Sequence, residues 1–314
     1  FKILGPEVSA KIRGLYFLDE RGLEITNLTT DFSYSKTQML FKNTTIATRT
    51  SNIKSDIKFA YKREDLQYFN DKVFITATFK ESTISLEDLH KFYGELGGND
   101  VLSFKTDLKG FLNEFTLDRL LLTSNESLEI KGDLKFKNAI NTENGFSLHG
   151  DFENVTSNYQ QLKSVLPNLL GKTLPTEFRK LGNFSLKGKT FVDENKLNVN
   201  AVIYSNIGTT KADLKLTNIS EIDNANYIGN IELVKFDIGR FFDDPNFGKV
   251  TLSGDVNGTG FRVDNINSGI VGVVKEIEFN GYNYKNLNVN GLFQKKLFNG
   301  NLNVNDSLFK MRFN

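Results

Sequence analysis

The stretch NGYNYKNLNVNGLFQKKLFNGNLNVND, residues 280–306, decides the fold of this chain. Its apolar side chains are Tyr282, Tyr284, Leu287 and Val289 in the first half, and Phe298, Leu302 and Val304 in the second. Within each half their positions differ by two or four, except for the step of three between Tyr284 and Leu287. Even spacing puts side chains on one face of a β-strand and leaves Asn and Lys on the other. The stretch therefore predicts two strands that share one apolar face.

The same alternation continues along most of the chain, for example over 73–79, 197–203 and 250–256. Turn signals such as Asn144-Gly145 and Asn257-Gly258 separate the runs. Short connections join antiparallel neighbours, because parallel neighbours need long crossovers. We therefore expect a mostly β fold: a long, twisted and curled antiparallel β-sheet that forms a trough with an apolar inner face.

Glycines recur inside the strand patterns, among them Gly110, Gly132, Gly188 and Gly254. Glycine within a strand often marks a bulge, a sharp bend or a close approach of another backbone. Several of these glycines fall in the register of the apolar residues. We expect the missing side chains to let the sheet bend towards its apolar face.

Three stretches break the alternation and predict short amphipathic helices that cover the sheet: 85–97 with a cap at Ser85, 157–170 entered at Ser157, and 237–244. Leu86, Leu89 and Tyr93 form the apolar side of the first. We expect one continuous elongated trough over 1–314, or a subdivision into 1–155 and 175–314 around a helical insertion at 156–174. The chain starts at Phe1 and stops within a strand pattern, so we expect a fragment of a longer protein.

Composition argues against several classes of function. The net charge is +1 and lysines are dispersed, whereas nucleic-acid-binding domains usually carry a clustered basic face. The chain has no cysteine, and its two histidines are far apart. Both Gly-Lys-Thr matches, at 171–173 and 188–190, lack the earlier glycine of a phosphate-binding loop. We expect no catalysis, no metal, no cofactor and no nucleic-acid partner.

A family resemblance rests on two C-terminal stretches. Residues 277–306 resemble the repeated unit of the TamB family of Bacteroidetes, within the wider AsmA-like group, and 236–261 is similar to the short helix and following strand of that family. The matching residues of the first stretch are Phe279, Tyr282, Tyr284, Asn286, Leu287, Gly291, Phe298, Gly300, Leu302, Val304 and Asp306. The two stretches cover about a quarter of the chain. The remainder shares the general strand pattern of the family but not its motif.

This resemblance implies a periplasmic location in a Gram-negative bacterium. The parent protein would be anchored in the inner membrane through a segment outside this chain and would meet an outer-membrane barrel protein of the TamA or BamA type. The implied function is a bridge that conducts phospholipid from the inner to the outer membrane, with acyl chains in the apolar trough. In this way it would support outer-membrane biogenesis.

We expect the following residues to line this lipid groove: Ile130, Leu134, Phe136, Phe146, Leu148, Leu197, Val199, Ile203, Leu214, Leu216, Leu252, Val256, Phe279, Tyr282, Tyr284, Leu287, Val289, Phe293, Phe298, Leu302 and Val304. Plain core packing is the alternative for the same residues. Two other functions stay open. One is a scaffold or chaperone that holds outer-membrane barrel proteins by strand addition. The other is a secreted adhesin or glycan-binding solenoid.

Overall fold

The computed structural model describes residues 2–4, 7–92, 98, 100–125, 127–165, 176–261, 264–294, 297–306 and 310–313. Strands make up 69% of the structure and helices 14%, and the antiparallel sheet is not closed into a barrel within these residues. The predicted mostly β fold, with a few short helices, is confirmed. The chain divides into two compact units: unit 1 holds 1–155 and 161–171, and unit 2 holds 156–160 and 172–314.

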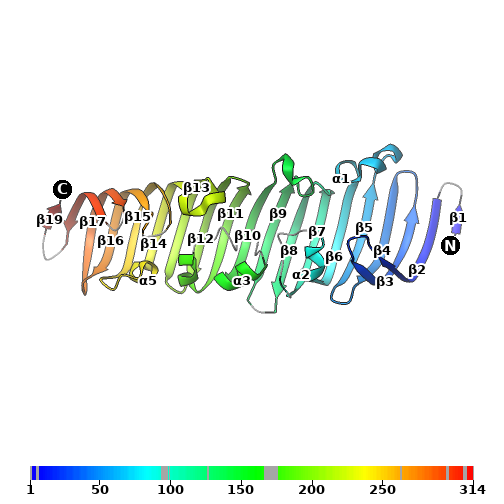
Figure 1. The fold of residues 1–314 in the computed structure, drawn as a ribbon, viewed down its shortest axis with the longest axis horizontal. Coiled ribbons are helices and arrows are strands. Elements are labelled where there is room, and N and C mark those ends of the chain that lie inside the picture. Colours follow the sequence, from blue (N-terminus) through cyan, green and yellow to red (C-terminus); the bar gives the residue numbers. More distant parts are fainter. Residues whose placement is uncertain are drawn as a thin grey trace. The chain divides into compact units, whose positions relative to one another are not determined.

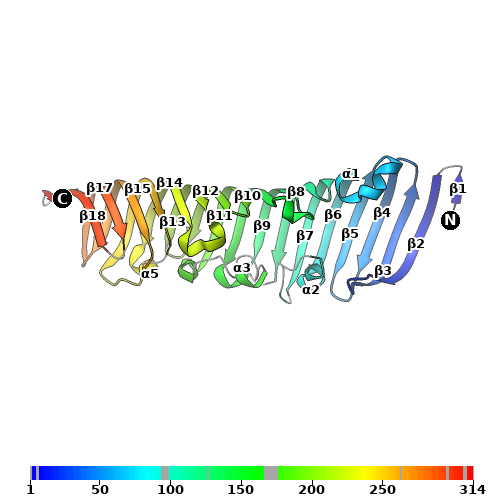
Figure 2. The same cartoon turned by 45° about the horizontal axis from the view of Figure 1, so that its top comes forward.

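Unit 1 is an antiparallel meander in which consecutive strands pair (Figures 1 and 2). Its strands are β1 (Lys2–Leu4), β2 (Glu7–Leu18), β3 (Glu24–Tyr34), β4 (Gln38–Ala47), β5 (Asn52–Ala60), β6 (Phe74–Ser85), β7 (Val101–Phe111), β8 (Glu114–Ser124), β9 (Glu129–Lys137) and β10 (Ser147–Asn158), which ends in the residues assigned to unit 2. Its helical turns are η1 (Arg63–Tyr68), α1 (Phe69–Lys72), α2 (Leu86–His90), η2 (Thr142–Asn144) and α3 (Tyr159–Val165), which begins in unit 2.

Unit 2 follows the same plan, with each strand paired to the next. The strands are β11 (Asn183–Asp193), β12 (Lys196–Ser205), β13 (Gly208–Thr217), β14 (Asn226–Asp237), β15 (Phe247–Thr259), β16 (Asn267–Phe279), β17 (Tyr282–Gln294), β18 (Leu297–Asn305) and β19 (Lys310–Phe313). The helical turns are η3 (Thr176–Leu181), η4 (Ile219–Asn224) and α5 (Ile238–Phe242).

The order of elements recurs along the chain. Three strands, a 3₁₀ turn, a fourth strand and a short α-helix follow one another from β3 to α2, with α1 added after η1. The same order returns from β7 to α3 and again from β11 to α5. The chain therefore contains a tandem four-strand module, which the sequence pattern alone did not reveal.

Two bulges in unit 1 repeat in detail. Asn43 on β4 has φ 51°, and its backbone N–H donates to Asp56 Oδ1 on β5 at 2.7 Å. Arg119 on β8 has φ 54°, and its N–H donates to Asp133 Oδ1 on β9 at 2.7 Å. Thr30 Oγ1 and Thr106 Oγ1 donate to the carbonyls of the residues that precede these bulges, Lys42 and Asp118. In both modules polar side chains satisfy backbone groups that the bulge removes from the ladder.

The interruption of the alternation between Tyr284 and Leu287 coincides with another residue in the left-handed conformation. Asn286 has φ 55°, a conformation that Asn tolerates better than most residues. It lets Tyr284 and Leu287, three residues apart, pack in one cluster with Val274. The interrupted alternation therefore still produces one apolar face.

Neighbouring strands approach closely at glycines of unit 2. A Cβ on Gly229 would lie 2.0 Å from the carbonyl oxygen of Asp213, and one on Gly272 would lie 2.4 Å from that of Ser253. Both carbonyls belong to the neighbouring strand, and both distances are too short for any side chain. The glycines expected to permit bending therefore include positions where the neighbouring strand crosses the space of a side chain.

The helices agree with the sequence in place and differ in length. Ser85 Oγ accepts from the N–H of Glu87 and caps α2, as expected, but the helix ends at His90, and Tyr93 lies outside the described residues. The predicted entry of the second helix at Ser157 is wrong, because β10 continues to Asn158; residues 166–170 of that prediction lie outside the described part. Asp237 caps α5 by accepting from the N–H of Arg240, which confirms a helical turn within 237–244.

Candidate functional site

Strand register aligns apolar side chains of unit 2 into rows that cross the strands. One row runs over seven strands and contains Ile203, Thr210, Leu233, Leu252, Val274, Leu287 and Val304. A second row contains Leu197, Leu216, Tyr227, Gly258, Ser268, Phe293 and Phe298. No residue in either row carries a charge. We call this surface the unit 2 apolar face.

Most residues predicted for the groove in this half of the chain are covered on this face. Leu216, Val256, Leu287 and Val304 are buried. The partly covered ones are Leu197, Val199, Ile203, Leu214, Leu252, Phe279, Tyr282, Tyr284, Val289, Phe293 and Leu302. Phe298 is 43% exposed at the start of β18, although it pairs with Phe293 on the same face.

Segment η3 contacts residues near both ends of β14 in unit 2. The ring of Phe178 on η3 lies 6.5 Å from that of Phe261, which lies 5.1 Å from Tyr227 at the first end. Two residues further on, Lys180 Nζ donates to the carbonyl oxygen of Phe241 at 2.8 Å, beside the other end. Segment η3 therefore links side chains that lie beside the two ends of this strand.

Helix α5 lies over the unit 2 apolar face. Phe241 packs against the buried cluster that contains Phe236 and Leu287. The ring of Phe242 lies 6.5 Å from that of Phe293, near the end of β17. The aromatic side chains of α5 therefore cover part of this face.

Unit 1 has its own apolar face, which contains the remaining predicted residues. Ile130 pairs with Leu122, Leu134 with Leu117, and Phe136 with Phe115 across β8 and β9. The rings of Phe115 and Phe136 stack at 4.8 Å. Leu148 lies on β10 and is partly covered, as is Phe146, which directly precedes that strand.

An aromatic line on this face was not among the predicted groove residues. Phe32, Phe41, Phe59 and Phe69 follow one another across β3, β4, β5 and α1, with centroid separations of 4.9, 5.6 and 5.3 Å. The alternation that contains Phe59 was visible in the sequence. Its continuation through Phe32 and Phe41 is visible only in the strand register.

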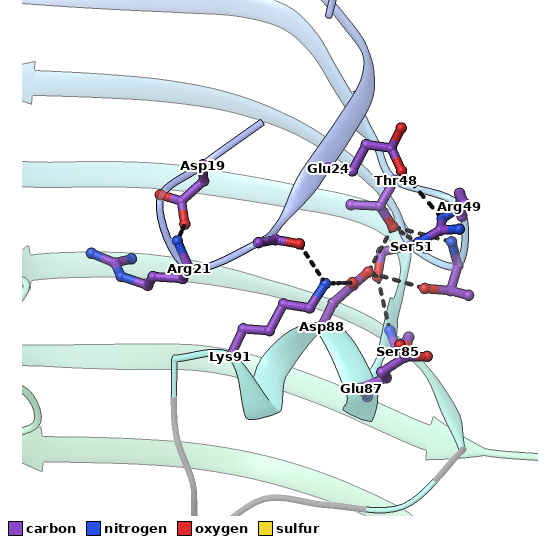
Figure 3. A network of polar contacts seen from close by, with 12 residues as sticks. Asp19, Arg21, Glu24, Thr48, Arg49, Ser51, Ser85, Glu87, Asp88 and Lys91 are labelled. Atoms are coloured by element: carbon purple, nitrogen blue, oxygen red, sulfur yellow. Dashed lines mark hydrogen bonds and ion pairs between the residues drawn. The ribbon is translucent and has the colours of Figure 1, made fainter. Parts of the chain in front are cut away.

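A polar network holds α2 against neighbouring hairpins in unit 1 (Figure 3). Asp88 Oδ2 accepts hydrogen bonds from the hydroxyls of Thr48 and Ser51 at 2.6 Å each and from Thr50 at 3.1 Å. Lys91 Nζ lies 3.8 Å from Asp88 Oδ1 and donates to the carbonyl of Gly22. Asp88 therefore joins the end of β6 to the β4–β5 turn, and Lys91 extends the network to the β2–β3 turn.

Asp88 is buried, with 10% of its side chain exposed. Burial by itself would raise its pKa, but the hydroxyl hydrogen bonds from Ser51, Thr48 and Thr50 and the Lys91 charge outweigh burial and lower it. The carboxylate is thus the stable form at neutral pH. Its partners are structural hydroxyls, and the cluster contains no histidine or cysteine that could act as a base or nucleophile.

In the part of the chain that the structure describes, no three His, Cys, Asp or Glu side chains lie close enough together to hold a metal ion. Among the same residues, no helix is both long and apolar enough to cross a membrane. Comparison with protein families, curated proteins and solved structures found no match to this chain. The apolar faces are therefore the sites that the geometry itself singles out.

Proposed function

We propose that the apolar faces bind the acyl chains of lipids and let them move along the sheet. The observation that carries the proposal is the uncharged row from Ile203 to Val304, which crosses seven strands without a break. Transfer of a methylene group from water to such a surface contributes about 0.8 kcal/mol. Similar side chains at each strand would give similar affinity at each step, which favours sliding over tight capture.

In its wider form, the proposal is a periplasmic bridge that carries phospholipid from the inner to the outer membrane of a Gram-negative bacterium. The resemblance of 277–306 to TamB repeats supports this form. Its partners would be an outer-membrane barrel protein and an inner-membrane anchor outside this chain.

The test is to purify the protein from cells and measure co-purifying phospholipid by mass spectrometry. Val289→Arg places a cation on the unit 2 apolar face, whereas Asn290→Arg places the same cation one residue further on, where the side chain is exposed. We expect bound phospholipid to fall at least severalfold in the first variant and to stay unchanged in the second. Circular dichroism and thermal unfolding check that both variants fold. Lipid-free wild-type protein, or equal lipid in two folded variants, would overturn the proposal.

A second candidate is strand addition, favoured by one observation in unit 1. Leu15, Tyr16, Phe17 and Leu18 on β2 are all at least 42% exposed, and β1 pairs only with Glu7–Ser9 among the described residues. An exposed apolar edge can pair with an extended peptide. A scaffold of this kind would co-purify with polypeptide cross-linked to β2, and Val289→Arg would not release that polypeptide.

A further inference from the structure

Two elements of unit 2, η3 and α5, cover part of the surface that we propose for acyl chains. Leu181 of η3 and Phe241 of α5 pack against the cluster of Phe236, Val274 and Leu287. Phe178 and Phe242 make further ring contacts with residues of the same unit, Phe261 and Phe293. The side chains of η3 and α5 therefore lie where an acyl chain on this face would have to lie.

One basic residue joins these two elements. Lys180 Nζ donates to the Phe241 carbonyl at 2.8 Å and to Asp243 Oδ2 at 2.5 Å. The Lys180 side chain is 23% exposed, but that of Asp243 is 78% exposed. Water and salt compete with an ion pair that is open on one side, so such pairs contribute little and break readily.

We propose that η3 is a strap that helps α5 to occlude the unit 2 apolar face, that Lys180 latches this strap to α5, and that an acyl chain enters by displacing η3. This inference rests on the proposed function and adds a gate to it. The apolar surface that Phe178 and Leu181 uncover on opening is covered again by the incoming acyl chain. The exchange needs no charged group inside the face. Its rate is set by how often the latch opens.

Strap opening can be measured without lipid by hydrogen exchange. The Asn206 N–H donates to the Leu181 carbonyl at 3.0 Å, which gives the segment a reporter amide. Lys180→Met keeps an apolar stem and removes the ammonium group. We expect exchange of the peptides over 176–182 and residue 206 to rise about two- to fivefold, the range of an exposed ion pair. Lys211→Met removes the Lys211–Glu232 ion pair on the opposite face of unit 2 and should leave these peptides unchanged.

Uptake of cis-parinaric acid, a fluorescent fatty acid, then links opening to entry. We expect Lys180→Met to take it up about two- to fivefold faster than wild type, and Lys211→Met to match wild type. The chain contains no cysteine, so Lys180→Cys with Asp243→Cys can be joined by a short cleavable bis-maleimide. Joining should slow uptake at least tenfold, and cleavage should restore it.

The outcomes separate the gate from the function. Fast uptake that is indifferent to both Lys180→Met and the cross-link overturns the strap and leaves the lipid site standing. Absence of binding to wild type, Lys180→Met and the uncross-linked double variant overturns the proposed function, and the gate with it. Unchanged hydrogen exchange in Lys180→Met overturns the assignment of Lys180 as the latch.

Discussion

In unit 1 register shifts coincide with bulges at Asn43 and Arg119, whose freed amides donate to Asp56 and Asp133. In unit 2 the close approaches at Gly229 and Gly272 leave no space for a side chain. The division is not complete. Gly110 and Gly132 of unit 1 also meet a neighbouring backbone, and in unit 2 the Lys285 N–H, beside the left-handed Asn286, donates to Asp306. The comparison shows two ways in which the same module accommodates irregular strands: carboxylates that accept from freed amides, and glycines that leave room for a neighbouring backbone.

The two devices have different weaknesses. A bulge amide that donates to a carboxylate has a weaker partner when the carboxylate is protonated, and no partner there when the side chain is removed. A glycine at a close backbone approach is indifferent to pH but tolerates no added methyl group. The following changes should therefore affect the two units selectively.

Gly229→Ala should have the largest effect and should act on unit 2. The added Cβ would lie 2.0 Å from the Asp213 carbonyl at a residue with φ +150°. We expect unit 2 to lose about 3 kcal/mol of unfolding free energy because β13 and β14 must separate. Hydrogen exchange during urea unfolding can report each unit. Gly281→Ala, where nothing lies within 4 Å, should cost about 1 kcal/mol of backbone strain. Equal losses in the two variants would rule out the steric explanation.

Asp88→Ala should destabilise unit 1 by about 2 kcal/mol, because three hydroxyl groups lose their shared acceptor. The exchange of peptides from α2 and the β4–β5 turn should rise, while unit 2 keeps its protection. Glu87→Ala, an exposed neighbour in the same helix, is the control and should change stability by less than about 0.5 kcal/mol. If Asp88→Ala and Glu87→Ala behave alike, the network in Figure 3 does not hold this edge.

Mild acid should give the smallest difference, again in unit 1. Hydrogen bonds from the Lys80 and Arg119 side chains lower the pKa of Asp56 and Asp107, and the pKa of Asp88 is also lowered. A carboxyl with a lowered folded-state pKa adds stability above its unfolded pKa, and this stability is lost as pH falls through the folded pKa. We therefore expect unit 1 to lose hydrogen-exchange protection between about pH 5 and pH 3, after correction for intrinsic exchange. Loss in unit 2 first would contradict the comparison.

The sequence predicted the features that depend on local periodicity. Period-two alternation located the strands, and every predicted groove residue except Phe298 is buried or partly buried, although lipid binding by these residues stays a prediction. The features it missed join residues far apart in the chain. Lys180 of η3 meets Phe241 and Asp243, about 60 residues further along the chain, and Asp88 of α2 meets Thr48 of the β4–β5 turn. No spacing rule within one strand encodes contacts between segments so far apart in sequence.

Neighbouring strands run in opposite directions, so the four-strand module restricts how the sheet can grow. Within unit 1, Leu86 of α2 and Leu162 of α3 pack in one cluster, although the two helices follow strands four apart in the sheet. Removal of a single strand, such as β9, would reverse every later strand and deliver Leu162 to the opposite edge, away from Leu86. Removal of two or four strands would keep both helices on the same edge. Length variants of this protein that retain the helices should therefore differ by even numbers of strands, and so should any gene duplication that lengthens the sheet.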